Sequence, residues 1–214
     1  MKFRKFLVWV MCFMVAIGIS PLVNAGKEIE IRAKLLNREE VISYLSSKGI
    51  VQTYENHQID TYYDNPSCTF FSDPDNVYKW LRIRVESGKI TLNFKHWLPE
   101  DAPIKTYCEE SEFELSSLSD MPSFLPKFGL SAHGYVPIIV VDKLRKSFMY
   151  KNCEISIDRV KDLGDYIEIE YKGTSDDVGA VQGLLKSILE EIGAKVGPMD
   201  HKGYAYHLIK LKFK

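Results

Sequence analysis

The sequence predicts an α+β protein, in which a closed eight-stranded antiparallel β-barrel is covered by a few helices. Apolar and polar residues alternate over many short segments, which is typical of half-buried strands. Most neighbouring segments are joined by short turns, as in antiparallel hairpins. A few segments suit a helix, and no Pro-, Gly- or Ser-rich linker divides the chain, so we expect one domain over residues 26–214.

The first strand, residues 28–35, shows the clearest alternation. Its charged positions are Glu28, Glu30, Arg32 and Lys34, and the residues between them are aliphatic. Successive side chains of a strand point to opposite faces, so one face is apolar and the other carries two carboxylates followed by two cations. Such a face favours the lining of a site over contact with bulk water.

Three segments are predicted to be helical. A capping-box pattern at Asn37 and Glu40 begins the first, and Ser175 is expected to cap the last. A glycine follows each of these two helices and provides its end. The helices are expected over residues 38–48, 121–128 and 176–192.

The remaining elements are predicted to be strands. Short turns at Ser87-Gly88 and Lys151-Asn152 predict two β-hairpins. Asn65-Pro66 is expected to end the second strand. The predicted strands after the first cover residues 58–64, 78–86, 89–97, 108–115, 136–149, 153–160, 166–171 and 204–211.

Charged side chains share one face on most of these strands, often as pairs of the same sign. For a single strand, the solvent-facing side of a half-buried sheet is the simpler explanation. The repetition of such pairs on several strands argues against this explanation. Two like charges about 4 Å apart repel by on the order of 4 kcal/mol at an effective dielectric constant of about 20. A bound partner of opposite sign would relieve the repulsion. The pairs are Arg82 with Arg84, Glu112 with Glu114, Lys143 with Arg145, and Glu168 with Glu170.

The two kinds of pair predict two kinds of ligand. Carboxylate pairs suit Mg²⁺ or Mn²⁺, since hard cations take oxygen ligands. Arginine and lysine pairs suit an oligophosphate, because its oxygens match the guanidinium fork. A barrel of this size has room for one small ligand, so inward-facing charges would form a polar tunnel. A triphosphate would then bridge the cations on one side and metal-bound carboxylates on the other.

Composition argues against some functional classes. A formal net charge of −1, with 45% hydrophobic and 27% charged residues, is ordinary for a globular protein. Near-neutral charge argues against a general nucleic-acid binder, so no nucleic-acid partner is predicted.

The first 25 residues differ from the rest. Lys2, Arg4 and Lys5 precede an apolar run over residues 6–19, and Ala25 is the last residue before a plausible cleavage site. This pattern predicts a signal peptide over residues 1–25 and a secreted or periplasmic mature protein. Two alternatives stay open. The leader could stay uncleaved as a membrane anchor, or the start codon could be misassigned, which would leave the protein cytoplasmic.

Many of the charged residues belong to short motifs that follow one another in a fixed order. The motifs are Glu28-x-Glu30-x-Arg32, Asp60-Thr-Tyr-Tyr-Asp64, Leu81-Arg-Ile-Arg84, Lys95, Lys143-Leu-Arg145, and Asp158 followed by Gly164-Asp-Tyr-Ile-Glu-Ile-Glu170. Each motif is weak alone, but the ordered set resembles the CYTH superfamily, the triphosphate tunnel metalloenzymes. That group includes class IV adenylate cyclases, thiamine triphosphatases and inorganic tripolyphosphatases. The resemblance covers almost the whole chain after the leader.

The resemblance implies roles for these residues. The carboxylates would bind Mg²⁺ or Mn²⁺ or orient metal-bound water, and the cations would hold phosphates. The implied metal ligands are Glu28, Glu30, Asp158, Glu168 and Glu170, with Glu112 or Glu114 in the acidic place of the middle strand. The implied phosphate ligands are Arg82, Arg84, Lys95, Lys143 and Arg145.

Position 32 departs from the family signature, which has lysine there. Arginine keeps its charge, so phosphate binding survives, but arginine cannot share a proton as lysine can. Lys34 lies on the same predicted face and is an alternative proton carrier. The expected catalytic group is Glu28, Glu30, Arg32 and Lys34.

Three functions fit one such site. The first hypothesis is a metal-dependent hydrolase that cleaves the terminal phosphoanhydride of a nucleoside, thiamine or inorganic triphosphate. Export favours it, because a cyclic nucleotide made outside the cytoplasm has little obvious use. The alternatives are a class IV adenylate cyclase, which converts ATP to cyclic AMP and pyrophosphate, and a non-catalytic oligophosphate-binding module. The expected partner is a small-molecule triphosphate, a homodimer is a further hypothesis, and stable membrane insertion is expected only if the leader stays uncleaved.

Overall fold

The computed structural model describes residues 24–67, 77–101, 106–115, 130, 134–175 and 177–212. The predicted helix over residues 121–128 and nearly all of the predicted leader lie outside these ranges. The described strands are β1 (Asn24–Glu28), β2 (Glu30–Leu35), β3 (Gln52–Asp64), β4 (Lys79–Glu86), β5 (Lys89–Leu98), β6 (Tyr107–Leu115), β7 (Val136–Tyr150), β8 (Cys153–Val160), β9 (Gly164–Tyr171) and β10 (Val196–Met199). The described helices are α2 (Arg38–Ser47), α4 (Val178–Glu191) and α5 (Tyr204–Lys212). In these ranges no helix has the length and apolar character needed to cross a membrane.

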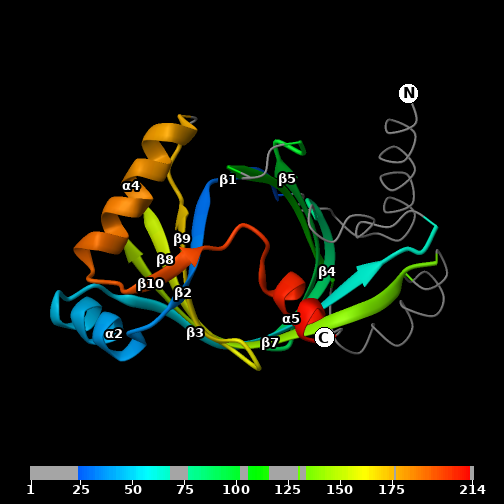
Figure 1. The fold of residues 1–214 in the computed structure, drawn as a ribbon, viewed down its shortest axis with the longest axis horizontal. Helices are drawn as coiled ribbons and strands as arrows, with labels where there is room; N and C mark the ends of the chain where they lie inside the picture. Colours follow the sequence, from blue (N-terminus) through cyan, green and yellow to red (C-terminus); the bar gives the residue numbers. More distant parts are fainter. Residues whose placement is uncertain are drawn as a thin grey trace.

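The strands form one antiparallel sheet, which confirms the α+β class but not the closed eight-stranded barrel. Pairing runs through ten strands in the open order β1-β6-β5-β4-β3-β7-β8-β9-β2-β10. The ladder does not close because the first strand is split at Ile29: β1 pairs with β6, and β2 pairs with β9. Because β1 and β2 follow each other in the chain, the chain itself connects the first strand of this order with the last but one. Figure 1 shows the resulting strongly curved sheet.

Two tight turns fix the register of the strands that carry the predicted site. Ser87 and Gly88 have φ of 46° and 78°, and Lys151 and Asn152 have φ of 49° and 55°. Positive φ at both central residues is what a two-residue hairpin turn requires. Both predicted hairpins are therefore confirmed, β4 with β5 and β7 with β8.

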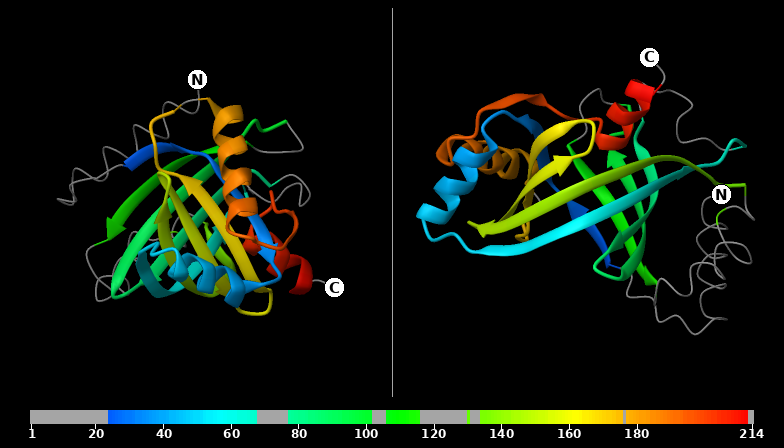
Figure 2. Two further views of the ribbon diagram at one scale, coloured as in Figure 1. Left: turned by 90° about the vertical axis from the view of Figure 1, so that its left-hand side faces the viewer. Right: turned by 90° about the horizontal axis from the view of Figure 1, so that it is seen from below.

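The main apolar core lies outside the curved sheet. Buried residues of β8 and β9, such as Ile155 and Ile169, pack against Leu45 of α2 and Leu185 of α4. Figure 2 shows both helices against the outer side of this half of the sheet. Because side chains alternate between faces, covering the apolar face turns the charged face inward.

The helix ends differ from the predicted caps. The side-chain amide of Asn37 donates to Glu40 at 2.9 Å, but its Oδ1 accepts from the backbone N–H of Lys195 at 2.8 Å. Asn37 therefore ties α2 to the chain after α4 and does not cap the N–H groups of α2. Asp177, which accepts from the N–H of Ala180 at 3.0 Å, takes the capping role predicted for Ser175.

The predicted strand over residues 204–211 is wrong, because these residues form α5. A turn precedes it, in which Asp200 accepts from the N–H groups of Lys202 and Gly203 at 2.9 and 3.2 Å. Tyr204 and Leu208 are buried one helical turn apart, which stabilises a helix on this surface. The short strand β10, which pairs with β2, was not predicted.

Candidate active site

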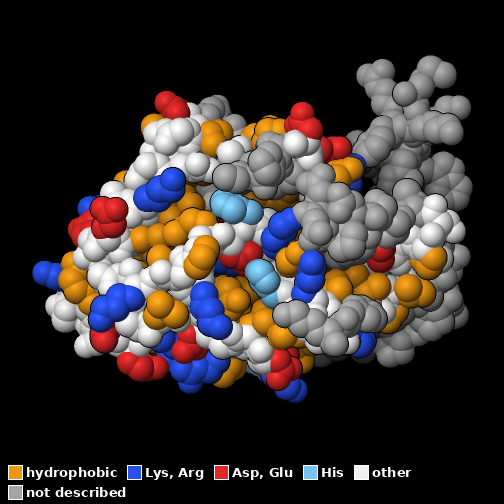
Figure 3. Space-filling view, in the orientation of Figure 1, with side chains coloured by type: hydrophobic (Ala, Val, Ile, Leu, Met, Phe, Trp, Pro, Cys, Tyr) orange, Lys and Arg blue, Asp and Glu red, His pale blue; other side chains and the backbone are white. Residues whose placement is uncertain are grey.

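The inner face of the sheet encloses a polar cavity of about 750 Å³. Side chains from β1 to β9 line it, together with residues 199–205. In the space-filling view, histidine, lysine and arginine side chains gather near the centre of the face that Figure 3 displays.

Most of the predicted site residues lie together in the wall of this cavity. Lys34 does not, because its side chain is exposed to solvent outside the cavity. Asp158 lies beneath the wall and is fully buried. The predicted residues in the wall are Glu28, Glu30, Arg32, Arg82, Arg84, Lys95, Glu112, Lys143, Arg145, Glu168 and Glu170, with Glu114 beside them.

A buried carboxylate on β3 holds the two arginines of β4. Asp60 is 1% exposed and accepts from Nε and Nη2 of Arg84 at 2.6 and 2.8 Å. Arg82 donates to the same carboxylate at 3.2 Å. Burial alone would raise the pKa of Asp60, but Arg84 and Arg82 outweigh burial and hold that pKa well below its usual range. Asp60 therefore stays ionised and fixes both guanidinium groups in the wall.

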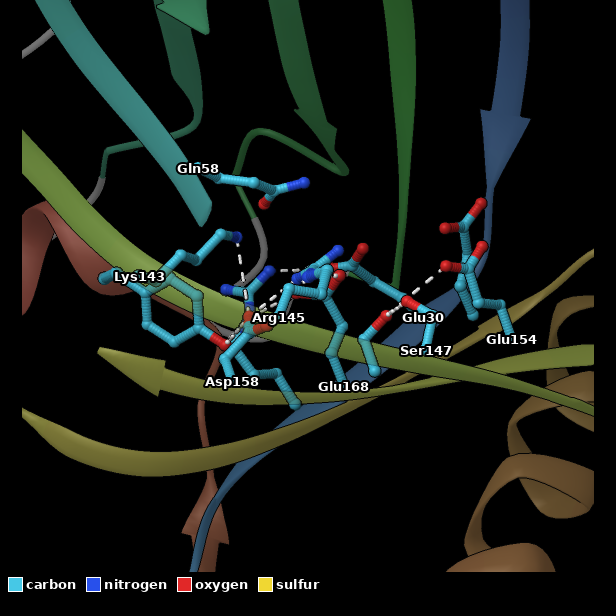
Figure 4. Close-up of polar contacts among 12 residues, drawn as sticks. Glu30, Gln58, Lys143, Arg145, Ser147, Glu154, Asp158 and Glu168 are labelled. Atoms are coloured by element: carbon cyan, nitrogen blue, oxygen red, sulfur yellow. Dashed lines mark hydrogen bonds and ion pairs between the residues drawn. The ribbon is translucent and has the colours of Figure 1, made fainter. Parts of the chain in front are cut away.

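A second buried carboxylate holds the cations of β7 (Figure 4). Arg145 donates to both oxygens of Asp158 at 2.7 Å and to Glu168 at 3.1 Å. Lys143 Nζ lies 3.4 Å from Asp158, and Tyr204 donates its hydroxyl to Asp158 at 2.9 Å. Burial, together with the charges of Arg145 and Arg84, lowers the pKa of Lys143 to about 7.

A third cluster joins β1, β5 and β6. Lys95 Nζ lies 2.5 Å from Glu28 and 3.6 Å from Glu110. Burial raises the pKa of Glu28 to about 8 despite the charge of Lys95, and Glu110 contributes to the rise. The Cys108 thiol donates to Glu28 at 3.2 Å. Lys95 thus forms ion pairs with two neighbouring carboxylates, those of Glu28 and Glu110.

Arg32 is held from three sides. Its guanidinium lies 2.5 Å from Glu30, 2.8 Å from Glu168 and 4.0 Å from Asp200. The ring centroid of Tyr204 lies 5.0 Å from its Cζ. Burial would lower the pKa of Arg32, but Glu168 and Glu30 raise it well above its usual value, so this residue cannot release a proton.

The wall also holds a row of carboxylates that suits a divalent cation. Strand register places Glu154 opposite Glu170, and Glu170 opposite Glu30. Burial raises the pKa of Glu30 and of Glu170, and the charge of Glu168 adds to both shifts. Within the described ranges, no three acidic, histidine or cysteine side chains form a ready-made metal cluster. The donor set still fits Mg²⁺ or Mn²⁺, because it consists of oxygens whose mutual repulsion a dication would relieve.

Sequence reasoning missed several residues of this site. Asp60 opens the motif Asp60-Thr-Tyr-Tyr-Asp64, to which the sequence assigns no role. Glu110 has the same strand parity as Glu112, which could have identified it. Glu154 has the same strand parity as Asp158 and could have been identified in the same way. Tyr204 and Asp200 left no such signal, because they reach the cavity from α5 and the turn before it.

Comparisons with known proteins identify the family and the fold of this chain. The CYTH domain family matches residues 26–194. The Methanocaldococcus jannaschii protein named "Putative adenylate cyclase MJ0240" is 27% identical over 167 residues, which cover 78% of this chain and 88% of that protein.

Solved structures show the same fold. The PH1819 protein of Pyrococcus horikoshii has a TM-score of 0.68 at 21% identity, covering 86% of this chain and 99% of its own. HpAC1 of Hippeastrum, for which a dominant triphosphatase activity is described, has a TM-score of 0.57 at 18% identity, covering 86% and 96%. Since the family match spans most of the sequence, the chain belongs to the CYTH domain family.

Proposed function

We propose that this protein is a metal-dependent enzyme that hydrolyses the terminal phosphoanhydride of a triphosphate bound in the cavity. The observation that carries the proposal is the pair of anchored clamps: Asp60 fixes Arg82 and Arg84, and Asp158 fixes Lys143 and Arg145. Preorganised cations stabilise developing negative charge without reorganising during the reaction, which is the main requirement of phosphoryl transfer.

The carboxylate row supplies the complementary half of the site. Proteins of the CYTH family are generally metal-dependent. Glu28, Glu30 and Glu170 would hold Mg²⁺ or Mn²⁺, because they are oxygen donors of the same cavity wall, and neighbouring carboxylates add to the rise in pKa that burial causes in each. The bound ion would neutralise phosphate oxygens and lower the pKa of a water molecule. Lys95 keeps Glu28 in place, and Arg32 does the same for Glu30.

Because Arg32 cannot release a proton, another residue of this chain must transfer protons in the reaction. Lys34, the alternative considered from sequence, lies outside the cavity. Lys143 lines the cavity, and its lowered pKa of about 7 lets it exchange a proton near neutral pH. Lys143 is therefore our candidate for the proton-handling role of the family lysine.

The name of the archaeal relative favours a second function, adenylate cyclase. The activity described for HpAC1 favours hydrolysis. A panel of ATP, thiamine triphosphate and tripolyphosphate, each with Mg²⁺ or Mn²⁺, separates the two. Release of phosphate supports the hydrolase, and cyclic AMP with pyrophosphate supports the cyclase.

The control for this assay is a pair of matched variants. Arg84→Gln removes a clamp residue, whereas Arg159→Gln makes the same change at an exposed position paired with Asp165. Loss of turnover in the first variant alone supports the site. Saturable triphosphate binding without turnover in the unmodified protein would instead mean a binding module.

A further inference from the structure

The C-terminal segment reaches the cavity although it lies outside the family match. That match ends at residue 194, whereas residues 199–205 line the cavity. Figure 1 shows this segment crossing in front of the sheet before it enters α5. These residues therefore belong to the cavity wall although the family match ends before them.

Tyr204 makes the most consequential contacts of this segment. It is 5% exposed, and its hydroxyl donates to Oδ2 of Asp158, the oxygen that Arg145 and Lys143 share. Its ring centroid lies 5.1 Å from Nζ of Lys143 and 5.0 Å from Cζ of Arg32. One side chain of α5 thus contacts charged groups of β2, β7 and β8.

The turn before α5 is fitted to Arg32. The N–H of Asp200 donates to the backbone carbonyl of Arg32 at 2.7 Å. Gly203 has φ of 84°, and a Cβ at this position would lie 3.3 Å from Nη1 of Arg32. The positive φ therefore favours glycine, and a methyl group at this position would press on the guanidinium, which would have to shift by a few tenths of an ångström.

We propose that Tyr204 is a positioning residue, through which the docking of α5 sets the geometry of the Asp158–Lys143–Arg145 clamp. The inference rests on the proposed function, because it assigns the clamp to triphosphate binding. A hydrogen bond to a charged group is stronger than a neutral one, and cations over an aromatic face are attracted to it, so Tyr204 restrains three charged groups together. Coupling between two sites is reciprocal, so a triphosphate in the clamp must also stabilise α5.

The test compares Tyr204→Phe, which removes only the hydroxyl, with Tyr206→Phe, which makes the same change on the same helix outside the cavity lining. The probe is the magnesium complex of imidotriphosphate, whose P–N–P bridges resist hydrolysis. We expect Tyr204→Phe to weaken binding by about three- to tenfold and to raise KM more than it lowers kcat. Tyr206→Phe should behave as the unmodified protein.

Gly203→Ala gives an independent perturbation of the docking of α5, because the added methyl group presses on Arg32 and the tyrosine hydroxyl stays in place. We expect it to weaken binding as well. Hydrogen exchange in the unmodified protein provides a readout without substitution: imidotriphosphate should protect the amides of residues 204–212. No added protection, or unmodified affinity in both variants, would overturn the role of Tyr204. If the unmodified protein binds no triphosphate at all, the proposed function fails instead.

Discussion

Asp60 offers the sharpest test of the anchored clamp. Asp60→Asn keeps the shape of the side chain but removes the charge that faces Arg82 and Arg84. Removing one partner of a buried ion pair costs about 3–5 kcal/mol, because the remaining charge stays buried and uncompensated. Two guanidinium groups would be affected here, with Lys143 also close enough to influence Asp60. We therefore expect the free energy of unfolding to fall by at least ~3 kcal/mol.

For a domain of this size, 1 kcal/mol corresponds to about 2–4 °C in Tm, so Asp60→Asn should lower Tm by roughly 6–12 °C. Urea unfolding at pH 7 gives the free energy directly. The control is Asp142→Asn on the adjacent strand, whose carboxylate pairs with His57 and is 39% exposed. That change should cost less than about 1 kcal/mol.

The pH dependence gives a second check on the same residue. The folded pKa of Asp60 is depressed, so its contribution is present above the unfolded pKa of about 3.9 and is lost as the pH falls below it. The difference in stability between the unmodified protein and Asp60→Asn should therefore begin to narrow near pH 4 and shrink progressively as the pH falls further. Equal losses for Asp60→Asn and Asp142→Asn, or a constant difference down to pH 2, would refute the anchor.

The remaining predictions concern the reaction and its protons. Glu30→Ala should abolish turnover and leave the protein folded, and unchanged activity at saturating Mg²⁺ would remove it from the metal site. Lys143 has a depressed pKa of about 7, so its burial costs stability as the pH falls from about 10.4 to 7. Lys143→Met should remove that slope, measured as urea stability across this pH range. Triphosphate binding at pH 8 should take up a proton in the unmodified protein and not in Lys143→Met, as titration calorimetry in two buffers would detect. N-terminal sequencing of protein from fractionated cells should begin at Gly26 if the leader is cleaved as we propose.

Sequence predicted the parts of this protein that depend on local alternation. The strand containing Arg82 and the strand containing Lys143 were found because a two-residue period and a turn signal are both local. Helix α5 was missed, because Tyr204 and its neighbours favour strands by composition and only the preceding turn redirects them.

The split of the first strand at Ile29 was missed for a different reason. The choice of partner strands is a long-range property, and alternation continues smoothly through this position. The anchoring roles of Asp60 and Asp158 are also long-range properties. They depend on the strand register, which places Asp60 opposite Arg84 and Asp158 opposite Arg145. Sequence could place charges on a face but could not pair them.

The balance of charge in the cavity leads to a final prediction about the metal. Its wall holds ten carboxylates and nine lysine or arginine side chains. Asp60 and Asp158 contact the clamp cations from outside the cavity wall. Both are ionised, and their charges make the site more negative. A triphosphate with several negative charges enters such a site more favourably when cations enter with it, because the carboxylates of the wall repel the anion. We expect tripolyphosphate affinity to fall at least tenfold when a chelator removes Mg²⁺, and Arg159→Gln to leave this ratio unchanged. Calorimetric titration with and without the chelator measures it, and equal affinity under both conditions would mean that the paired cations alone suffice to bind the anion.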